Sequence, residues 1–207
     1  MLNEEVFISE AFKRLPKELI NKTKNKTVGI AGVGGLGSNI AVALIRTGIN
    51  NLIIADFDKV EYSNLNRQYY FYKHIGMSKV DALEEQLKNI NPYINIEKYN
   101  HYLDKNNFDI FKDCDVIVEA FDKAKNKEEI VDYAIRNKKY IVSGVGMAGD
   151  FSANIIQTKK LGKYLYISGD FKHEANDKNG LLASRVAITA NHQANMVIRL
   201  LQDKYEV

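Results

Sequence analysis

Short strand-like runs of apolar residues alternate along the chain with longer stretches in which apolar residues recur at helical spacing. Apolar runs are typical of strands buried on both faces, and a period of about 3.6 residues is typical of helices that cover a sheet. The pattern predicts strands over 27–31, 51–55, 93–99, 115–119 and 139–143, and helices over 38–47, 77–89, 104–112 and 124–137.

This alternation predicts a doubly wound, Rossmann-like α/β fold with a mostly parallel sheet and helices on both faces. The pattern changes after Gly149, where 154–158 and 163–168 predict an antiparallel pair of strands, and 183–203 predicts a closing helix with one apolar face. Residues 1–26 form a polar, amphipathic stretch that predicts a helical lead-in. Because no linker-like segment interrupts the chain, we expect 1–207 to be a single domain.

Composition excludes several classes of protein. The chain has 207 residues, of which 45% are hydrophobic, and this fraction excludes a disordered protein. Its net charge of +3 is too small to indicate nucleic acid as a partner. No apolar run approaches the roughly 18 residues that span a bilayer, and the start of the chain does not resemble a signal peptide. We therefore expect a cytoplasmic protein with no membrane partner.

The single cysteine, Cys114, limits the chemistry further. One cysteine forbids an internal disulfide and a zinc site built from paired cysteines, so we expect no zinc. Cys114 stands between Asp113 and Asp115, whose charges would raise its thiol pKa and make it a poor nucleophile. The sequence therefore predicts a structural role for it.

A glycine-rich turn lies between the first predicted strand and the helix after it. Gly32, Gly34 and Gly37, with Gly35 between them, have the spacing of a dinucleotide-binding turn, in which helix amide groups point at phosphate. Asp56, 19 residues beyond Gly37, ends the second predicted strand, where a carboxylate can accept the hydroxyls of a ribose. Together these features indicate an adenine nucleotide.

The polar stretch 56–68 distinguishes this chain from most dehydrogenases. Arg67 can bind phosphate through two parallel hydrogen bonds, and Lys79 at the start of the next helix can add a point charge. These two cations favour a triphosphate over a dinucleotide as the ligand. Surface ion pairing is the alternative for both cations. Asp122, just past the strand 115–119, has two interpretations that are compatible: a magnesium ligand facing the same crevice, or the N-cap of the helix that follows.

These motifs, in this order, resemble those of the superfamily of ubiquitin-activating enzymes and their bacterial relatives, and most of all the short ThiF-type adenylyltransferases. The likeness rests on the glycine turn, 56–58, 63–68 and 75–79, and also covers 119–122 and 190–195. It implies that Gly35 lies under the nucleotide and that Asp56 holds the ribose. It also implies that the chain binds ATP and Mg²⁺. Asn64, Arg67 and Lys79 would contact the phosphates, and Asp122 would bind magnesium. Further nucleotide contacts would come from Gly32, Gly34, Gly37, Asp58 and Asn66.

The resemblance also implies an activity and partners. Such enzymes adenylate the C-terminal glycine of a ubiquitin-like sulfur carrier, which for the ThiF type is a ThiS-like protein of thiamine biosynthesis. Larger relatives carry zinc-binding cysteine pairs, and many carry a cysteine that accepts a thioester, persulfide or acyl group. This chain has neither, so we expect it to adenylate its partner and to leave sulfur delivery to a separate donor. The family implies a homodimer.

Several points stay open at this stage. Relatives supply an arginine to the partner subunit's site, and Arg14, Lys13 or no residue at all could play that part here. Asp170 and Arg185 fit the short-form pattern without a role that can be derived, and His192 is expected to pack rather than to act as a base. The rival functions are a nicotinamide-dependent oxidoreductase, a nucleotide-binding subunit without catalysis, and a related enzyme that acts on the molybdopterin carrier or a modified tRNA base.

Overall fold

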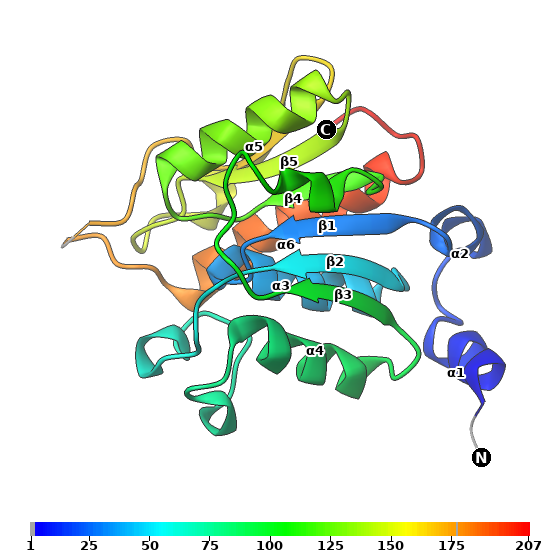
Figure 1. Cartoon of the computed structure of the whole chain (residues 1–207). Coiled ribbons are helices and arrows are strands. Elements are labelled where there is room, and N and C mark those ends of the chain that lie inside the picture. Colours follow the sequence, from blue (N-terminus) through cyan, green and yellow to red (C-terminus); the bar gives the residue numbers. More distant parts are fainter. Residues whose placement is uncertain (1–2, 177) are drawn as a thin grey trace.

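A seven-stranded sheet runs through the computed structural model, which describes residues 3–176 and 178–207 (Figure 1). All neighbouring strands are parallel except the last two, β7 and β6, which are antiparallel. From one edge to the other the strands are β3 (Asn95–Tyr99), β2 (Asn51–Ala55), β1 (Thr27–Ala31), β4 (Val116–Glu119), β5 (Tyr140–Val145), β7 (Leu165–Gly169) and β6 (Gln157–Leu161). The predicted Rossmann-like fold with an antiparallel extension is therefore confirmed. Residues 1, 2 and 177 of the predicted domain lie outside the described residues.

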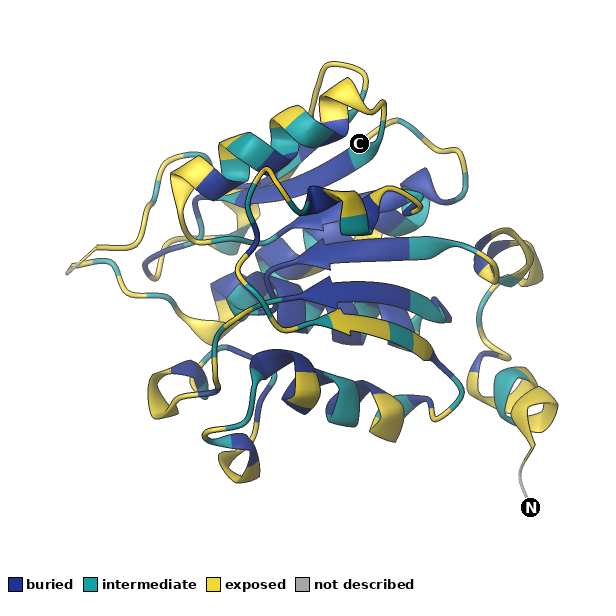
Figure 2. Ribbon diagram, in the orientation of Figure 1, coloured by how far each residue is buried: buried dark blue, intermediate teal, exposed yellow. Residues whose placement is uncertain are grey.

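Helices cover both faces of the sheet, which explains why the central strands are apolar throughout (Figure 2). One face packs against α3 (Gly35–Arg46), α4 (Lys79–Ile90) and α6 (Ala183–Leu200). The other face packs against α5 (Ala124–Arg136) and a short 3₁₀ turn, Phe108–Phe111. The edge strand β3 is largely exposed.

Local hydrogen bonding explains where the observed elements differ from the predicted ones. The helix predicted over 104–112 is only the 3₁₀ turn, because the side chains of Asp104 and Asn107 bond to backbone N–H groups of the preceding loop and compete with a helix. The antiparallel pair starts three residues later than predicted, at Gln157, because 153–155 form another 3₁₀ turn that the side chain of Ser152 caps. Helix α3 begins at Gly35 rather than Ser38. The remaining boundaries shift by up to three residues.

The N-terminal lead-in consists of two helices, α1 (Glu4–Ala11) and α2 (Lys17–Thr23), and Pro16 separates them. Phe12 and Leu19 are its buried anchors. Both helices lie beyond the amino ends of the strands (Figure 1). Among the described residues, no helix combines the length and apolar character needed to cross a membrane.

Candidate functional site

A cavity of about 640 Å³ opens where the parallel strands end at their carboxyl side. Residues that follow six different strands line it, which is the usual position of a ligand in an open α/β sheet. They include Gly32 and Gly34 after β1, Asp56 and Asp58 after β2, His101 and Tyr102 after β3, Asp122 after β4, Met147 after β5 and His173 after β7. The sequence placed the glycine turn and the three acidic residues at this edge, and the cavity brings them together.

The glycine turn is closely packed. Gly32 has a φ of +88°, and a Cβ atom there would lie 2.9 Å from the carbonyl oxygen of Ala120. A Cβ atom at Gly37 would lie 1.9 Å from the carbonyl oxygen of Gly32. The turn therefore tolerates no side chain at either position, and it directs the first amide groups of α3 towards the cavity.

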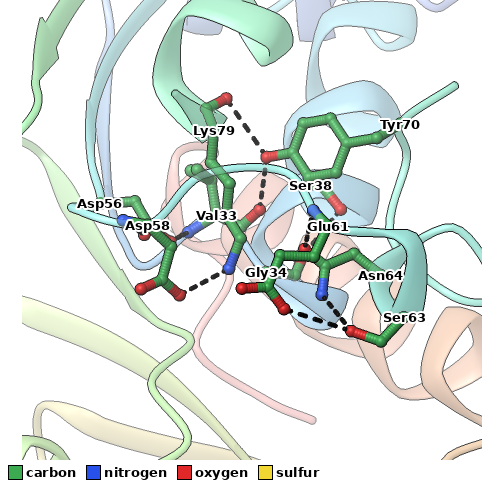
Figure 3. Close-up of polar contacts among 10 residues, drawn as sticks. All are labelled: Val33, Gly34, Ser38, Asp56, Asp58, Glu61, Ser63, Asn64, Tyr70 and Lys79. Carbon is green, nitrogen blue, oxygen red and sulfur yellow. Dashed lines mark hydrogen bonds and ion pairs between the residues drawn. The ribbon is translucent and has the colours of Figure 1, made fainter. Parts of the chain in front are cut away.

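Asp56 supports this turn as well as lining the cavity. Its Oδ2 atom accepts a hydrogen bond from the amide of Val33 at 2.8 Å, and its Oδ1 atom accepts one from the amide of Asp58 at 2.9 Å (Figure 3). Burial raises the pKa of Asp56, and the positive charge of Lys79 and the two amide hydrogen bonds oppose that rise. The carboxylate is thus fixed in orientation beside the turn.

Arg67 projects beside the glycine turn from a loop that its neighbours shape. Its Nη1 atom donates to the carbonyl of Ser63 at 3.0 Å and to Oδ1 of Asn66 at 2.8 Å. The buried Asn64 accepts a hydrogen bond from the amide of Glu61 at 3.0 Å (Figure 3). Arg67 lines the cavity, whereas the side chains of Asn64 and Asn66 shape the loop that presents it.

Lys79 is the second cation of the site, at the start of α4. Its side chain is buried, and Nζ lies 2.7 Å from Oδ2 of Asp58, whose side chain is 47% exposed. Both residues line the cavity. Asp58 thus holds Lys79 in place, so the two residues expected to contact the nucleotide form a pair.

Asp122 stands in the turn between β4 and α5 and lines the cavity. The N-cap of α5 is Lys123, and no side chain caps this end, so the N-cap interpretation of Asp122 is wrong. Within 3–176 and 178–207, its carboxylate accepts no hydrogen bond. The turn is held by the buried Glu119, whose Oε1 atom accepts from the amide of Phe121 at 2.7 Å and from Nζ of Lys127 at 2.9 Å.

The residues of this site fit magnesium only together with phosphate. The described part of the chain holds no group of three or more acidic, histidine or cysteine side chains that could enclose a metal. Mg²⁺ keeps several waters and is commonly held by one or two carboxylates plus substrate phosphates. The free carboxylate of Asp122 suits that kind of binding.

Sequence reasoning missed three residues that join the Arg67 loop to the glycine turn. Ser38 donates to the carbonyl of Gly34 at 2.6 Å and accepts from the amide of Tyr69 at 3.0 Å. Asn39 donates to the carbonyls of Gly35 and Arg67, and the hydroxyl of Tyr70 donates to the carbonyl of Val33. The available signal was that polar residues at 38 and 39 interrupt an otherwise apolar helix. Within the aromatic run 69–72, Tyr70 is buried, whereas Phe71 and Tyr72 are exposed.

The other expected residues lie outside the cavity. Cys114 is buried against the sheet, and burial, more than its acidic neighbours, raises the pKa of its thiol to about 12. His192 contacts Oγ1 of Thr158 at 3.2 Å, as expected for a packed residue. Lys13 and Arg14 are exposed in the segment between α1 and α2, and these two helices lie beyond the amino ends of the strands, whereas the cavity lies at the carboxyl ends (Figure 1). Neither reaches the cavity of its own chain.

Comparison with known proteins adds to this geometry. The ThiF family model matches residues 9–207. "Ubiquitin-like modifier-activating enzyme 5" of Bombyx mori is 40% identical over 125 residues, which are 56% of this chain and 31% of that protein. "Adenylyltransferase and sulfurtransferase UBA4" of Scheffersomyces stipitis is 31% identical over 165 residues, 74% of this chain and 37% of that protein. The chain thus spans about a third of the length of these curated relatives.

Solved structures share the fold over a longer stretch. The Escherichia coli tRNA N6-threonylcarbamoyladenosine dehydratase in complex with ATP superposes with a TM-score of 0.87 at 18% identity, covering 99% of this chain and 98% of that one. E. coli MccB with ATP gives a TM-score of 0.72 at 22% identity, covering 91% of this chain and 59% of the other. With the family model matching nearly all of the sequence, the chain belongs to the ThiF family.

Proposed function

We propose that this protein uses ATP to adenylate the C-terminal glycine of a small ubiquitin-like sulfur carrier, with a ThiS-like protein of thiamine biosynthesis as the first candidate. The observation that carries the proposal is the pairing of a glycine turn with two cations, Arg67 and Lys79, in one cavity with the free carboxylate of Asp122. A nucleoside triphosphate with magnesium would interact with all four features, whereas a nicotinamide dinucleotide would leave Asp122 without a role.

The proposed reaction is a displacement at phosphorus. A carboxylate oxygen of the carrier's last glycine attacks the α-phosphorus of ATP, an acyl–O–P bond forms, and the bond to the bridging oxygen breaks as pyrophosphate leaves. The carboxylate is already a nucleophile, so no strong base is required. The task that remains is positioning and neutralising charge on the phosphates.

Each site residue receives a role in this proposal. Asp56 accepts the ribose hydroxyls, the amides of the glycine turn contact phosphate, and Arg67 and Lys79 neutralise the charge that grows on the leaving pyrophosphate. Asp122 would hold magnesium, which supplies further positive charge when it is bound to the phosphates. Gly35 would lie under the nucleotide, and a Cβ atom there would lie 3.3 Å from Val186 and 3.8 Å from Nε of Arg67.

The partners follow from the same proposal. Because Cys114 is buried and its thiol stays protonated, sulfur would come to the acyl-adenylate from a separate donor. We further propose a cytoplasmic homodimer, in which Arg14 or Lys13 of one subunit could reach the other subunit's cavity. Both residues are exposed at the end of the sheet opposite their own cavity, which supports an intermolecular role over an internal one.

The decisive experiment is ATP–pyrophosphate exchange with purified candidate carriers, each tested with and without its terminal glycine. Exchange that depends on one carrier and on its glycine supports the proposal. A chain that binds ATP yet supports no exchange with any carrier would instead be a nucleotide-binding subunit without catalysis.

A modified tRNA base is the second candidate acceptor. The observation that favours it is the match in fold to the E. coli tRNA-modifying dehydratase, which extends over nearly the full length of both chains. The higher identity to ubiquitin-like modifier-activating enzymes favours a protein acceptor. This candidate predicts that tRNA with a carboxylate-bearing base stimulates ATP–pyrophosphate exchange and that every carrier protein is inactive. That result would identify a tRNA base as the acceptor.

A further inference from the structure

The cavity extends beyond the part that a nucleotide would fill. Asp56 and Lys79 belong to the β2 side of the sheet, and the glycine turn follows β1 at its centre. The cavity continues past β4 to the ends of β5 and β7. If the base and ribose lie towards β2 and β3, as the proposed function requires, the β5–β7 end is left for the second substrate.

Small and apolar residues line this β5–β7 end. They are Gly144, Gly146, Met147, Ala148, Ala175 and Leu181, and the polar residues Lys127, His173 and Glu174 line the same end. Such a lining suits an extended chain end with small, uncharged side chains, which can approach the wall closely and bond to it through backbone groups. Bulky side chains next to the terminal glycine would clash with this wall, whereas the terminal carboxylate itself would lie at the nucleotide.

Two loops form this wall, 146–152 after β5 and the described residues 170–176 and 178–181 after β7, and Arg185 joins them. Its guanidinium is buried at 3% exposure in the first turns of α6. It donates to the carbonyls of Phe151 at 2.6 Å and Ser152 at 3.0 Å, and it forms an ion pair with the buried Asp170. One side chain thus bonds to both loops.

Asp170 organises the second loop in turn. Its Oδ1 atom accepts from the amides of Lys172 and His173, both at 2.9 Å, and its Oδ2 atom lies 2.9 Å from Nδ1 of His173. The ring of His173 stacks on that of Phe151, with centroids 3.7 Å apart, and its carbonyl accepts from the amide of Ala148 at 3.1 Å. The loops are therefore fixed to each other at several points, all centred on the Arg185–Asp170 pair.

We infer that Arg185 and Asp170 are positioning residues for the acceptor: they hold the two loops in the arrangement that admits the carrier's C-terminal chain to the nucleotide. This inference rests on the proposed function and assigns a role to the far end of the same cavity. Neither residue touches the reacting atoms. Their loss should loosen the acceptor wall and leave the nucleotide end intact, because Asp56 and Lys79 are held by other contacts.

The test compares Arg185→Met with Arg199→Met. Arg199 lies at the opposite end of α6 and also donates to a backbone carbonyl, that of Glu206 at 3.0 Å, so it controls for losing an arginine from this helix. Asp170→Asn is a second variant that keeps the shape of the side chain. Amide hydrogen exchange of 146–152 and 170–176 measures the order of the wall directly. Steady-state ATP–pyrophosphate exchange gives KM separately for ATP and for the carrier.

We expect Arg185→Met to speed amide hydrogen exchange in both loops. It should also raise the KM for the carrier by roughly tenfold or more, which is the scale of losing one hydrogen bond to a charged group. The KM for ATP should change by less than about threefold, and Arg199→Met should resemble the wild type. Asp170→Asn should act like Arg185→Met in weaker form.

Three results overturn the inference. The first is amide hydrogen exchange that stays unchanged in both loops. The second is an unchanged KM for the carrier, and the third is a KM for ATP that rises as much as the KM for the carrier. If Arg185→Met fails to fold, Asp170→Asn decides the question by the same measurements. Absence of pyrophosphate exchange in the wild type refutes the proposed function and the acceptor role with it, whereas hydrogen exchange still shows whether Arg185 orders the two loops.

Discussion

The hydroxyl of Tyr70 donates a hydrogen bond to the backbone carbonyl of Val33 at 2.7 Å and lies 3.3 Å from that of Lys79 (Figure 3). One buried side chain therefore connects the glycine turn with the start of α4 and with the loop that carries Arg67. The position of both cations relative to the turn depends on this contact.

Tyr70→Phe removes the hydroxyl and leaves the Val33 carbonyl buried without this partner. We expect the free energy of unfolding to fall by about 1–2 kcal/mol, since an orphaned buried acceptor costs on that scale. ATP affinity should weaken as well, because the turn loses its tie to Lys79. Urea unfolding and calorimetric titration with ATP measure the two effects. Tyr72→Phe, at an exposed position, is the matched control.

Arg67→Ala should lower turnover by roughly 10² or more, because charge on the phosphates grows as pyrophosphate departs. Arg67→Lys should recover only part of this loss, since an ammonium group cannot replace the two-pronged grip of guanidinium. Pyrophosphate exchange at saturating ATP gives the comparison. Turnover unaffected by either substitution would show that Arg67 does not act on the triphosphate.

Asp122→Asn should depress adenylation by roughly 10² while the melting temperature stays near that of the wild type. A neutral amide holds a hard cation poorly, and the structure shows that Asp122 caps no helix, so stability has no reason to change. A magnesium titration of exchange activity is the measurement. Normal exchange at ordinary magnesium would remove Asp122 from the site.

Cys114→Ala should leave pyrophosphate exchange within a few-fold of the wild type, because the thiol is far from the cavity and is kept protonated. With a pKa of about 12, only about one molecule in 10⁴ carries the thiolate at pH 8. The folded protein should therefore react with iodoacetamide far more slowly than the urea-unfolded chain. Rapid alkylation of the folded protein would contradict the structural role.

His74 should make the protein less stable as the pH falls from 7.5 to 5.5. Burial lowers the pKa of His74 below its usual value of 6.5, and its Nδ1 atom accepts a hydrogen bond from the amide of Phe71 at 3.0 Å. Below pH 6.5 the unfolded chain binds the proton more readily than the folded one, so the free energy of unfolding decreases with decreasing pH. Urea unfolding at both pH values should show a shallower dependence in His74→Gln. An equal dependence in both proteins would disprove this.

The sequence was sufficient for the sheet because the central strands are apolar on both faces, and that signal is local. It was also sufficient for the residues at the strand ends, since Asp56 and Asp122 follow directly after β2 and β4. Boundaries were harder. The helix α3 begins within the glycine cluster, where propensity argues against a helix but packing against Gly32 and Val186 permits one.

Contacts between distant segments could not be predicted in this way. Ser38 and Tyr69 are 31 residues apart, and Arg185 is 34 residues from Phe151, so no local pattern joins them. The family resemblance implied a phosphate contact for Asn64 and a nucleotide contact for Asn66. The fold shows that their side chains hold the loop, a distinction that depends on side-chain direction rather than on position in the chain.

The position of α6 has a consequence for how the chain folds during its synthesis. This helix supplies Val186, Ala190, Ala194 and Val197 to the core that it shares with α3, yet it is made long after β1, β2 and β4. Until residue 200 has left the ribosome, the apolar surface of α3 and the adjoining strands is uncovered. The nascent chain would therefore expose an apolar surface to other proteins for most of its translation. Binding of chaperones to this surface should fall sharply once α6 emerges.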